Sequence, residues 1–386
     1  MRVVHIQSGG FYDGWTYQEN LLTKWQHKNG HDVIVITTRW SADNKGKAIL
    51  VSEDKYDYIN DDGVRIIRLP LTGTDQYSFG YDELYSTIDN CKPDVLFIHG
   101  VTNNTKALIK YLSLHKNVIA YADSHSDFSN SAPFGKYDPR FQAYRLSGFS
   151  SRESKRLIPY VKKFYGVLPA RVDYLSYVYR IPKEKCELLL MGADDELVSE
   201  ARNTEVKQSI RNMYDIEPDD FLVMTGGKID SFKAQTLLLM QAVKNIDNQH
   251  VKLIVFGPVS DELKEKFDAL VDGTKIQHIG YVEGKETYKH FAASELVVFP
   301  GRHSVFWEQA AGLGLPMLCK EWEGTKHVDL GGNVRFLKHD SVKEIQSEIQ
   351  RLLNNPEEYK LMKSVAEREG MKTFSYRNIA LQSLEE

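Results

Sequence analysis

The stretch RVVHIQSGGFYDGWTYQENLLTKWQHKNGHDVIVIT, residues 2–37, decides the expected fold. An apolar run at residues 2–7 leads through a glycine-containing turn into an amphipathic segment at 17–28, and a second apolar run follows at 32–37. Short runs that are apolar almost throughout are typical of strands buried on both faces of a sheet. We therefore predict an α/β fold that begins with a strand, a helix and a parallel strand.

The same alternation continues to about residue 121 and begins again at residue 221. In the first half we also predict strands at 64–69, 94–99 and 117–121, and helices at 105–114 and roughly 140–160. In the second half we predict strands at 221–225, 251–256, 276–279, 296–299 and 317–319, and helices at 235–245, 261–271, 285–293, from 307, at 343–353 and at 357–369. Two such runs imply two doubly wound, Rossmann-like domains, connected by the polar stretch 194–220.

Length and composition agree with this expectation and exclude several classes of protein. A chain of 386 residues exceeds the roughly 250–300 residues at which a single core splits into domains. The balance of 49 Lys and Arg against 53 Asp and Glu, a net charge of −4, excludes a uniformly basic protein, and we expect no nucleic-acid partner. Three distant cysteines favour a reducing compartment, and neither a signal peptide nor a membrane span is expected, so a cytoplasmic protein is predicted.

Two glycine-containing loops directly follow predicted strands. Gly9-Gly10 would let a ligand approach the backbone before the first helix, but the spacing is not G-x-G-x-x-G, which argues against a dinucleotide cofactor. Gly227-Lys228, with Lys233 five residues later, suits a diphosphate because lysine binds phosphate as a point charge. The alternatives are a flexible turn in the first case and two solvated lysines in the second.

A third loop, Pro300–Ser304, leads into a predicted helix. Ser304 is expected to cap that helix, whose free N–H groups could hold an anion. Glu308 and Gln309, in the first turns, could bond sugar or ribose hydroxyls. The alternative is an ordinary capped helix with a solvated first turn.

A fourth loop carries a histidine beside two carboxylates. His125 lies between Asp123 and Asp127, directly after a predicted strand, and could act as a general base or hold a sugar hydroxyl. A structural role for His125 is the alternative. A Ser-His-Asp triad is not supported, because no G-x-S-x-G elbow occurs.

Residues 152–185 form a basic stretch with interleaved aromatic residues. It contains nine cations against three acids. We favour a solvated helix face with a buried aromatic side. The alternative is a face that rests on anionic lipid headgroups, which would make the protein peripheral at the inner face of the membrane.

Six short segments, taken in order, resemble the GT-B glycosyltransferases, in particular the retaining glycosyltransferase family 4. The resemblance covers nearly the whole chain. The segments are Gly30-His31-Asp32-Val33, Leu190-Met191-Gly192-Ala193-Asp194, Gly227-Lys228-Ile229 with Lys233, Gly280-Tyr281-Val282, Gln309-Ala310 through Gly314-Leu315-Pro316, and Phe374-Ser375-Tyr376.

The resemblance implies the architecture and the reaction. It implies an acceptor-side domain at 1–195, a nucleotide-sugar-binding domain at 196–370, and a terminal helix at 371–386 that crosses back to the first domain. It also implies retaining, metal-independent transfer of a sugar from a nucleotide-diphosphate sugar, with UDP favoured, to a glycan or lipid-linked acceptor. Cell-surface polysaccharide synthesis is the expected setting, and no cofactor is expected.

The resemblance also assigns roles to residues. Lys228 and Lys233 would bind the donor diphosphate, which Gly9 and Gly10 would approach from the other domain. His125 would lie by the reacting sugar, next to Asp123. The other implied donor contacts are Gly227, Ser304, Glu308 or Gln309, and the backbone at Tyr281-Val282, which would contact the base.

The chain departs from the family at one pair of positions. The family has two glutamates eight positions apart, and alignment on Gly314-Leu315-Pro316 places Gly301 and Gln309 there. Glu308, one position before Gln309, could substitute for one of these glutamates, and His303 could occupy space near the missing one. Two alternatives therefore stay open: a nucleotide-sugar 2-epimerase, and a catalytically inactive partner subunit that binds nucleotide sugar.

Overall fold

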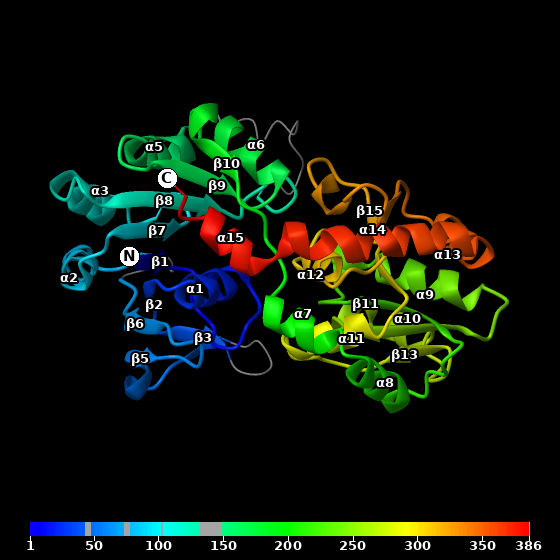
Figure 1. Cartoon of the computed structure of the whole chain (residues 1–386). Helices are drawn as coiled ribbons and strands as arrows, with labels where there is room; N and C mark the ends of the chain where they lie inside the picture. Colours follow the sequence, from blue (N-terminus) through cyan, green and yellow to red (C-terminus); the bar gives the residue numbers. More distant parts are fainter. Residues whose placement is uncertain (43–47, 73–77, 102, 132–147, 386) are drawn as a thin grey trace. The chain divides into compact units, whose positions relative to one another are not determined.

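The computed structural model describes residues 1–42, 48–72, 78–101, 103–131 and 148–385 (Figure 1). The chain forms two compact units. The first comprises Met1–Leu190 and Ile379–Glu386, and the second comprises Met191–Asn378. Each unit contains one mainly or wholly parallel sheet with helices packed on it. This confirms the predicted pair of Rossmann-like α/β folds.

The first unit is built on an eight-stranded sheet in the order β10-β9-β8-β7-β1-β2-β6-β5, in which only β5 is antiparallel. Its strands are β1 (Arg2–Gln7), β2 (Asp32–Thr38), β5 (Asp57–Ile59), β6 (Arg65–Leu69), β7 (Val95–His99), β8 (Ile119–Ser124), β9 (Lys163–Gly166) and β10 (Cys186–Leu188). Its helices are α1 (Gln18–Lys28), α2 (Tyr81–Cys91), α3 (Thr105–Leu114), α5 (Phe149–Leu157) and α6 (Pro169–Tyr177). A separate hairpin pairs β3 (Trp40–Ala42) with β4 (Ala48–Leu50).

The two faces of this sheet differ in chemistry. Alternate residues of a strand point to opposite faces. Val4 and Ile6 of β1 pack in one core with Leu108 of α3. His5, between them, points to the other face, where it stacks on Phe97 of β7. One face is therefore an ordinary apolar core, whereas the opposite face buries a polar group at its centre.

The second unit has a six-stranded, wholly parallel sheet in the order β13-β12-β11-β14-β15-β16. Its strands are β11 (Phe221–Gly226), β12 (Val251–Phe256), β13 (Ile276–His278), β14 (Leu296–Phe299), β15 (Met317–Lys320) and β16 (Val334–Leu337). Its helices are α7 (Asp195–Ala201), α8 (Thr204–Met213), α9 (Thr236–Lys244), α10 (Asp261–Asp268), α11 (Glu286–Ala292), α12 (Phe306–Gly312), α13 (Val342–Asn354) and α14 (Pro356–Phe374). α9 and α13 pack on the same apolar core.

The charges of the polar stretch 194–220 predict a plain connection, but the structure does not show one. The stretch contains α7 and α8, and each helix has a side-chain cap: Asp194 accepts from the backbone of Glu196, and Asn203 accepts from that of Glu205. A stretch with few apolar residues can form these two helices, because each helix is short and buries only one or two apolar residues.

Residues 152–185 do not form a single helix face, so that interpretation is wrong. They pass through α5, β9 and α6. Phe164 and Tyr165 are buried in the sheet, and Arg171 is buried in an ion pair with Asp127 at 3.2 Å. The predicted helix at 140–160 begins outside the described residues, which contain α5.

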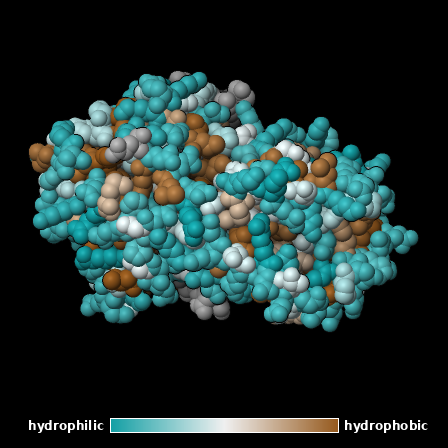
Figure 2. Space-filling view, viewed as in Figure 1, coloured by the Kyte–Doolittle hydropathy of each residue, from teal (hydrophilic) through white to brown (hydrophobic). Residues whose placement is uncertain are grey.

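The surface of the described residues offers no membrane-spanning element. None of their helices is both long enough and apolar enough to cross a bilayer. On the face shown in Figure 2, hydrophilic side chains predominate and apolar side chains gather in smaller patches.

The end of the chain returns to the first unit. After α14 the chain continues into α15 (Tyr376–Gln382), and the residues from Ile379 onward belong to the first unit. There, Tyr121 donates to the carbonyl of Glu385 at 3.2 Å, and Gln26 Nε2 donates to Ser383 Oγ at 2.9 Å. This confirms the predicted terminal crossing.

We expect Gly370→Ala to destabilise the protein by about 1–3 kcal/mol, as overpacking does. Gly370 lies in α14, and a Cβ there would be 2.2 Å from the carbonyl oxygen of Ala311 in α12. Replacing glycine by alanine in an unpacked helix would instead stabilise it by roughly 0.5–1 kcal/mol. Urea unfolding of the variant measures whether the free energy of unfolding falls or rises, and Ser364→Ala, an exposed position in α14, is the control. A gain in stability would contradict the close approach of α12 to α14.

Candidate functional site

Three loops meet at the carboxyl ends of neighbouring strands in the second unit. Gly227, after β11, donates its N–H to Phe256, and Gly257, after β12, donates to the carbonyl of Gly280. A Cβ on Gly257 would lie 2.1 Å from the carbonyl oxygen of Gly227, and the φ of Gly257 is +117°. Only glycine fits there, because both the space and the backbone conformation exclude a side chain.

Lys233 presents its ammonium group to this glycine loop. A Cβ built on Gly227 would lie 3.4 Å from Lys233 Nζ. The 3-10 turn Ser231–Lys233, capped by the side chain of Asp230, holds the lysine in place. Burial lowers the pKa of Lys233, although Asp230 opposes this. In the described part of the chain no ion pair joins Lys233 to a carboxylate, so its charge can face an anion.

Lys228 lies differently. Its side chain is 70% exposed, and its Nζ is 3.4 Å from Asp230 Oδ2. The structure therefore places Lys233 against the loop and leaves Lys228 in a mainly solvated ion pair. A mainly solvated ion pair of this kind contributes little to the stability of the fold.

The loop after β14 adjoins the same place. A Cβ on Gly301 would be 3.5 Å from the Cα of Lys233, and one on Gly227 would be 3.7 Å from the ring of Phe306. The expected cap by Ser304 is wrong. Val305 is the N-cap and has helical dihedral angles, and no side chain caps α12. The carbonyl of Ser304 instead accepts from Trp307, because the chain enters the helix through a tight turn.

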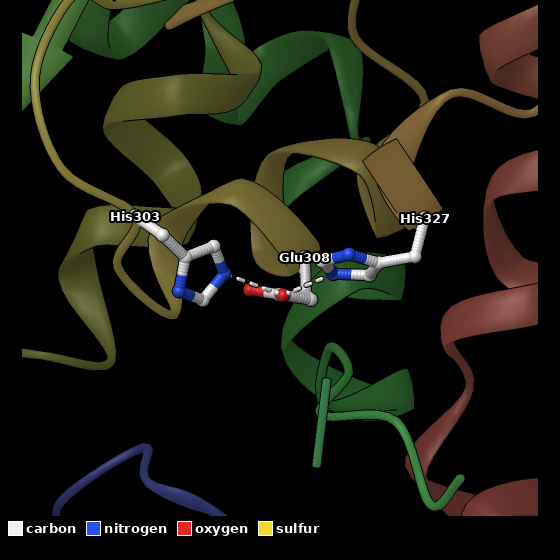
Figure 3. A group of neighbouring side chains, drawn as sticks. All are labelled: His303, Glu308 and His327. Carbon is white, nitrogen blue, oxygen red and sulfur yellow. Dashed lines mark hydrogen bonds and ion pairs between the residues drawn. The ribbon is translucent and has the colours of Figure 1, made fainter. Parts of the chain in front are cut away.

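Glu308 is held by two histidines (Figure 3). His303 Nε2 and His327 Nε2 both donate to Glu308 Oε1, at 2.7 and 2.6 Å. The carboxylate is fully buried, and its other oxygen, Oε2, has no hydrogen-bond partner among the described residues. Burial alone would raise the pKa of Glu308, but the two histidines lower it to about 2. Glu308 is therefore a buried, ionised acceptor.

His327 was missed by the sequence analysis. It lies in the 3-10 turn Lys326–Val328, 19 residues after Glu308. No local spacing links the two residues, because the intervening strand β15 brings them together. The sequence signal that could have indicated His327 was its residue type, because it is a histidine downstream of the candidate His303.

The group His303, Glu308 and His327 has the residue types that bind a divalent metal, and its ligand atoms lie within 4.8 Å of one another. The observed separations of 2.6 and 2.7 Å are hydrogen-bond lengths. Ligands of a tetrahedral zinc ion would lie about 3.3 Å apart. The arrangement is therefore that of a hydrogen-bonded carboxylate. A second group with suitable atoms, Asp219, Asp220 and His250, lies mostly at the surface.

The remaining candidates of the second unit have mixed environments. Gln309 is fully buried in α12, next to Glu308. Tyr281 is 59% exposed, and Val282 is partly buried. Both follow Gly280, whose carbonyl binds Gly257, so the predicted base contact adjoins the glycine loops.

In the first unit, Asp123 is fully buried at the end of β8 and bonds to His99 of the neighbouring strand β7. His99 Nδ1 lies 2.8 Å from Asp123 Oδ2. Burial alone would raise the pKa of Asp123, but His99 and His125 hold it below its usual range. His99 was not a predicted site residue, although it ends an apolar run in parallel register with Asp123.

His125 lies between the carboxylates of Asp123 and Glu19, whereas the sequence predicts Asp123 and Asp127. His125 Nε2 is 3.8 Å from Asp123 Oδ2 and 3.9 Å from Glu19 Oε1. Asp127 instead forms an ion pair with Arg171. Glu19 also accepts from Gln7 at 3.2 Å, which ties His125 to the end of β1.

The loop Gly9-Gly10 directly follows β1, at the same sheet edge. Gly9 is exposed, whereas Gly10 is buried with a φ of +96°. A Cβ on Gly10 would lie 2.9 Å from the hydroxyl of Tyr12. The positive φ, more than the contact with the Tyr12 side chain, favours glycine at position 10.

Comparison by sequence finds no match: neither a family model nor a curated protein matches the chain. Comparison by structure does. A glycosyltransferase from Rickettsia africae is 12% identical with a TM-score of 0.72, covering 99% of this chain and 96% of that one. Anabaena Alr3699/HepE in complex with UDP is 13% identical with a TM-score of 0.69, covering 99% and 98%. The chain has the GT-B glycosyltransferase fold.

The chain is also similar in structure to a UDP-GlcNAc 2-epimerase from Neisseria meningitidis bound to UDP-GlcNAc. That protein is 14% identical with a TM-score of 0.63, covering 100% of this chain and 99% of that one. The likeness therefore identifies the fold and not the reaction.

Proposed function

We propose that this protein transfers a sugar from a UDP-sugar to a glycan or lipid-linked acceptor, with retention at the anomeric carbon. The observation that carries the proposal is the Lys233 ammonium, which lies beside Gly227 without a carboxylate partner in the described part of the chain. A fold likeness to a protein in complex with UDP supports a uridine diphosphate donor.

In the proposed reaction, the bond between the anomeric carbon and the diphosphate breaks while a bond to the acceptor oxygen forms on the same face. Negative charge develops on the departing diphosphate, and Lys233 stabilises it in a partly desolvated site. The leaving phosphate takes the acceptor proton. The sequence contains no recognisable motif for a carboxylate pair of the retaining-hydrolase kind, and the proposal invokes no covalent intermediate. It also needs neither metal nor cofactor.

The other candidate residues have supporting roles in this proposal. Lys228 supplements the charge of Lys233 at the diphosphate, and Gly227 permits its close approach. Tyr281 and Val282 contact the base, Ser304 lies at the phosphate, and Glu308 or Gln309 bonds ribose or sugar hydroxyls of the donor. In the first unit, Gly9, Gly10, Asp123 and His125 hold the sugar or the acceptor.

A donor-binding experiment tests the proposal. UDP should raise the melting temperature, because a ligand at a hundred times its dissociation constant stabilises the native state by roughly 2.7 kcal/mol. We expect no such shift with GDP, ADP, CMP or NAD at the same concentration. Incubation with UDP-sugars and candidate glycan acceptors should then release UDP only when an acceptor is present. No shift with UDP would contradict the proposal.

The second candidate is a nucleotide-sugar 2-epimerase, favoured by the likeness to the Neisseria enzyme. It predicts an epimerised nucleotide sugar in the absence of any acceptor. The third is an inactive partner subunit, motivated by Gly301 and Gln309 at the positions of the two family glutamates. It predicts UDP-sugar binding without turnover across many acceptors. Donor binding and acceptor-dependent UDP release, together with analysis of the nucleotide sugar after incubation without acceptor, therefore separate all three.

A cytoplasmic location, with peripheral contact at the inner face of the membrane, belongs to this proposal. Exposed cations support it. They are Arg152, Lys155, Arg156 and Lys162, from α5 and the segment that follows it. Co-sedimentation with vesicles containing anionic lipid, compared with neutral vesicles, tests it.

A further inference from the structure

A buried line of polar side chains joins the end of the chain to Asp123 within the first unit. Gln26 Nε2 donates to Ser383 Oγ at 2.9 Å, and Gln26 Oε1 lies 2.7 Å from His5 Nε2. His5 Nδ1 lies 2.9 Å from His99 Nε2, and His99 Nδ1 lies 2.8 Å from Asp123 Oδ2. All five side chains are almost wholly buried. The line therefore runs from the turn after α15 through α1, β1 and β7 to β8.

Ser383 determines which atom donates and which accepts in each hydrogen bond of this line. Its hydroxyl has one proton, which it donates to the carbonyl of Ala380 at 2.7 Å. Ser383 Oγ is then an acceptor for the amide of Gln26, which turns the amide oxygen toward His5. That oxygen can only accept, so His5 carries its proton on Nε2.

The state of His5 decides the state of His99. Burial lowers the pKa of His5 to about 3, so its ring is neutral near pH 7. A neutral ring with its proton on Nε2 has a lone pair on Nδ1, and this lone pair must accept from His99 Nε2. The other nitrogen of His99 faces the carboxylate of Asp123, which can only accept. Both nitrogens of His99 must therefore carry a proton.

We propose that His99 is a buried imidazolium ion, and that it is a positioning residue which fixes Asp123 beside His125. The charged and titratable groups that face this pair are His5 from β1, Glu19 from α1 and His125 after β8. Although burial alone would lower the pKa of His99, Asp123 raises it above its ordinary value.

The positioning role follows from how Asp123 is held. His99 binds Asp123 Oδ2, whereas Oδ1 has no hydrogen-bond partner among the described residues. His125 Nε2, 3.8 Å from Asp123 Oδ2, also has none. A charged partner on one oxygen keeps the carboxylate ionised and leaves the other oxygen to accept a hydroxyl. This role, unlike the protonation state, rests on the proposed function.

The protonation state is tested on the whole protein labelled with ¹⁵N at histidine. We expect both ring nitrogens of His99 to remain protonated from pH 6 to pH 8.5, although an unperturbed imidazole loses its proton near pH 6.5. A neutral ring with its only proton on Nδ1 would overturn the proposal, because His99 Nε2 would then accept a hydrogen bond from His5 Nδ1 and not donate one to it. Neutron diffraction would locate the same protons without any variant.

The positioning role is tested with His99→Gln, which keeps a donor toward Asp123 but not the charge. We expect kcat for transfer to fall by about tenfold or more, with little change in the KM for UDP-sugar. The acid limb of the pH profile should move to higher pH, because Asp123 loses the neighbour that keeps it ionised. Ser347→Ala, which removes an exposed serine of α13, is the control.

Two results separate this inference from the proposed function. An unchanged pH profile in His99→Gln would overturn the positioning role. If the natural protein shows no transfer at all, the proposed function fails, but the ¹⁵N experiment still decides whether His99 is an imidazolium ion.

Discussion

Replacing Lys233 by alanine is expected to slow sugar transfer by about 10²–10³-fold and to leave the second unit folded. The loss of one preorganised group that faces developing charge has an effect of this size. Lys233 Nζ is beside Gly227, is partly desolvated and has no carboxylate partner in the described part of the chain. Steady-state kinetics with a UDP-sugar, together with UDP affinity by calorimetry, measure the effect.

The matched control is Lys264→Ala, which removes a lysine of α10 that is 57% exposed and pairs with Asp268. Its rate should match that of the natural protein. Lys228→Ala should have a smaller effect than Lys233→Ala, because Lys228 is mainly solvated and already pairs with Asp230. Activity of Lys233→Ala within a few-fold of the natural protein would remove this lysine from the mechanism.

Replacing Glu308 by glutamine should destabilise the protein by about 3 kcal/mol at pH 7. Two charge-assisted hydrogen bonds, each contributing roughly 1.5–3 kcal/mol, become weaker neutral ones. Both end on a fully buried oxygen, so water cannot replace them. Urea unfolding at pH 7 measures the change, with the exposed α10 variant Glu265→Gln as the control.

The pH dependence of this difference is a further test. The pKa of Glu308 is about 2 in the folded protein, below its value of about 4.3 in an unfolded chain. Ionised Glu308 therefore stabilises the fold above about pH 4.3, and this contribution is lost as the pH falls toward 2. The stability gap between the natural protein and Glu308→Gln should shrink over that range. A gap that is constant down to pH 2 would show that Glu308 is not held as an ion.

The sequence by itself determined most of the sheet. Strands β1, β12 and β14 have the bounds that their apolar runs predict, because a strand buried on both faces must be apolar throughout. Strand β9 and helix α6 were missed, since their buried aromatic residues alternate with cations along residues 152–185. Helices α7 and α8 were missed because their caps and charges resemble those of a polar connection.

The sequence also determined the parts of the site that are local. Gly227 and Lys233 are six positions apart, and a strand end followed by a short turn suffices to bring the lysine back onto the glycine. The same holds for Asp123 and His125, which share the end of β8. Candidates of this kind need only one strand and the loop after it.

Only the tertiary structure decided which groups hold these residues. His99 meets Asp123 because β7 and β8 lie side by side in parallel register, and His327 meets Glu308 because a strand intervenes between them. Gln26 reaches Ser383 only because the chain returns to the first unit within α15. Proton positions in buried networks depend on every partner along the line, and those partners are far apart in sequence, so no local pattern of residues can specify them.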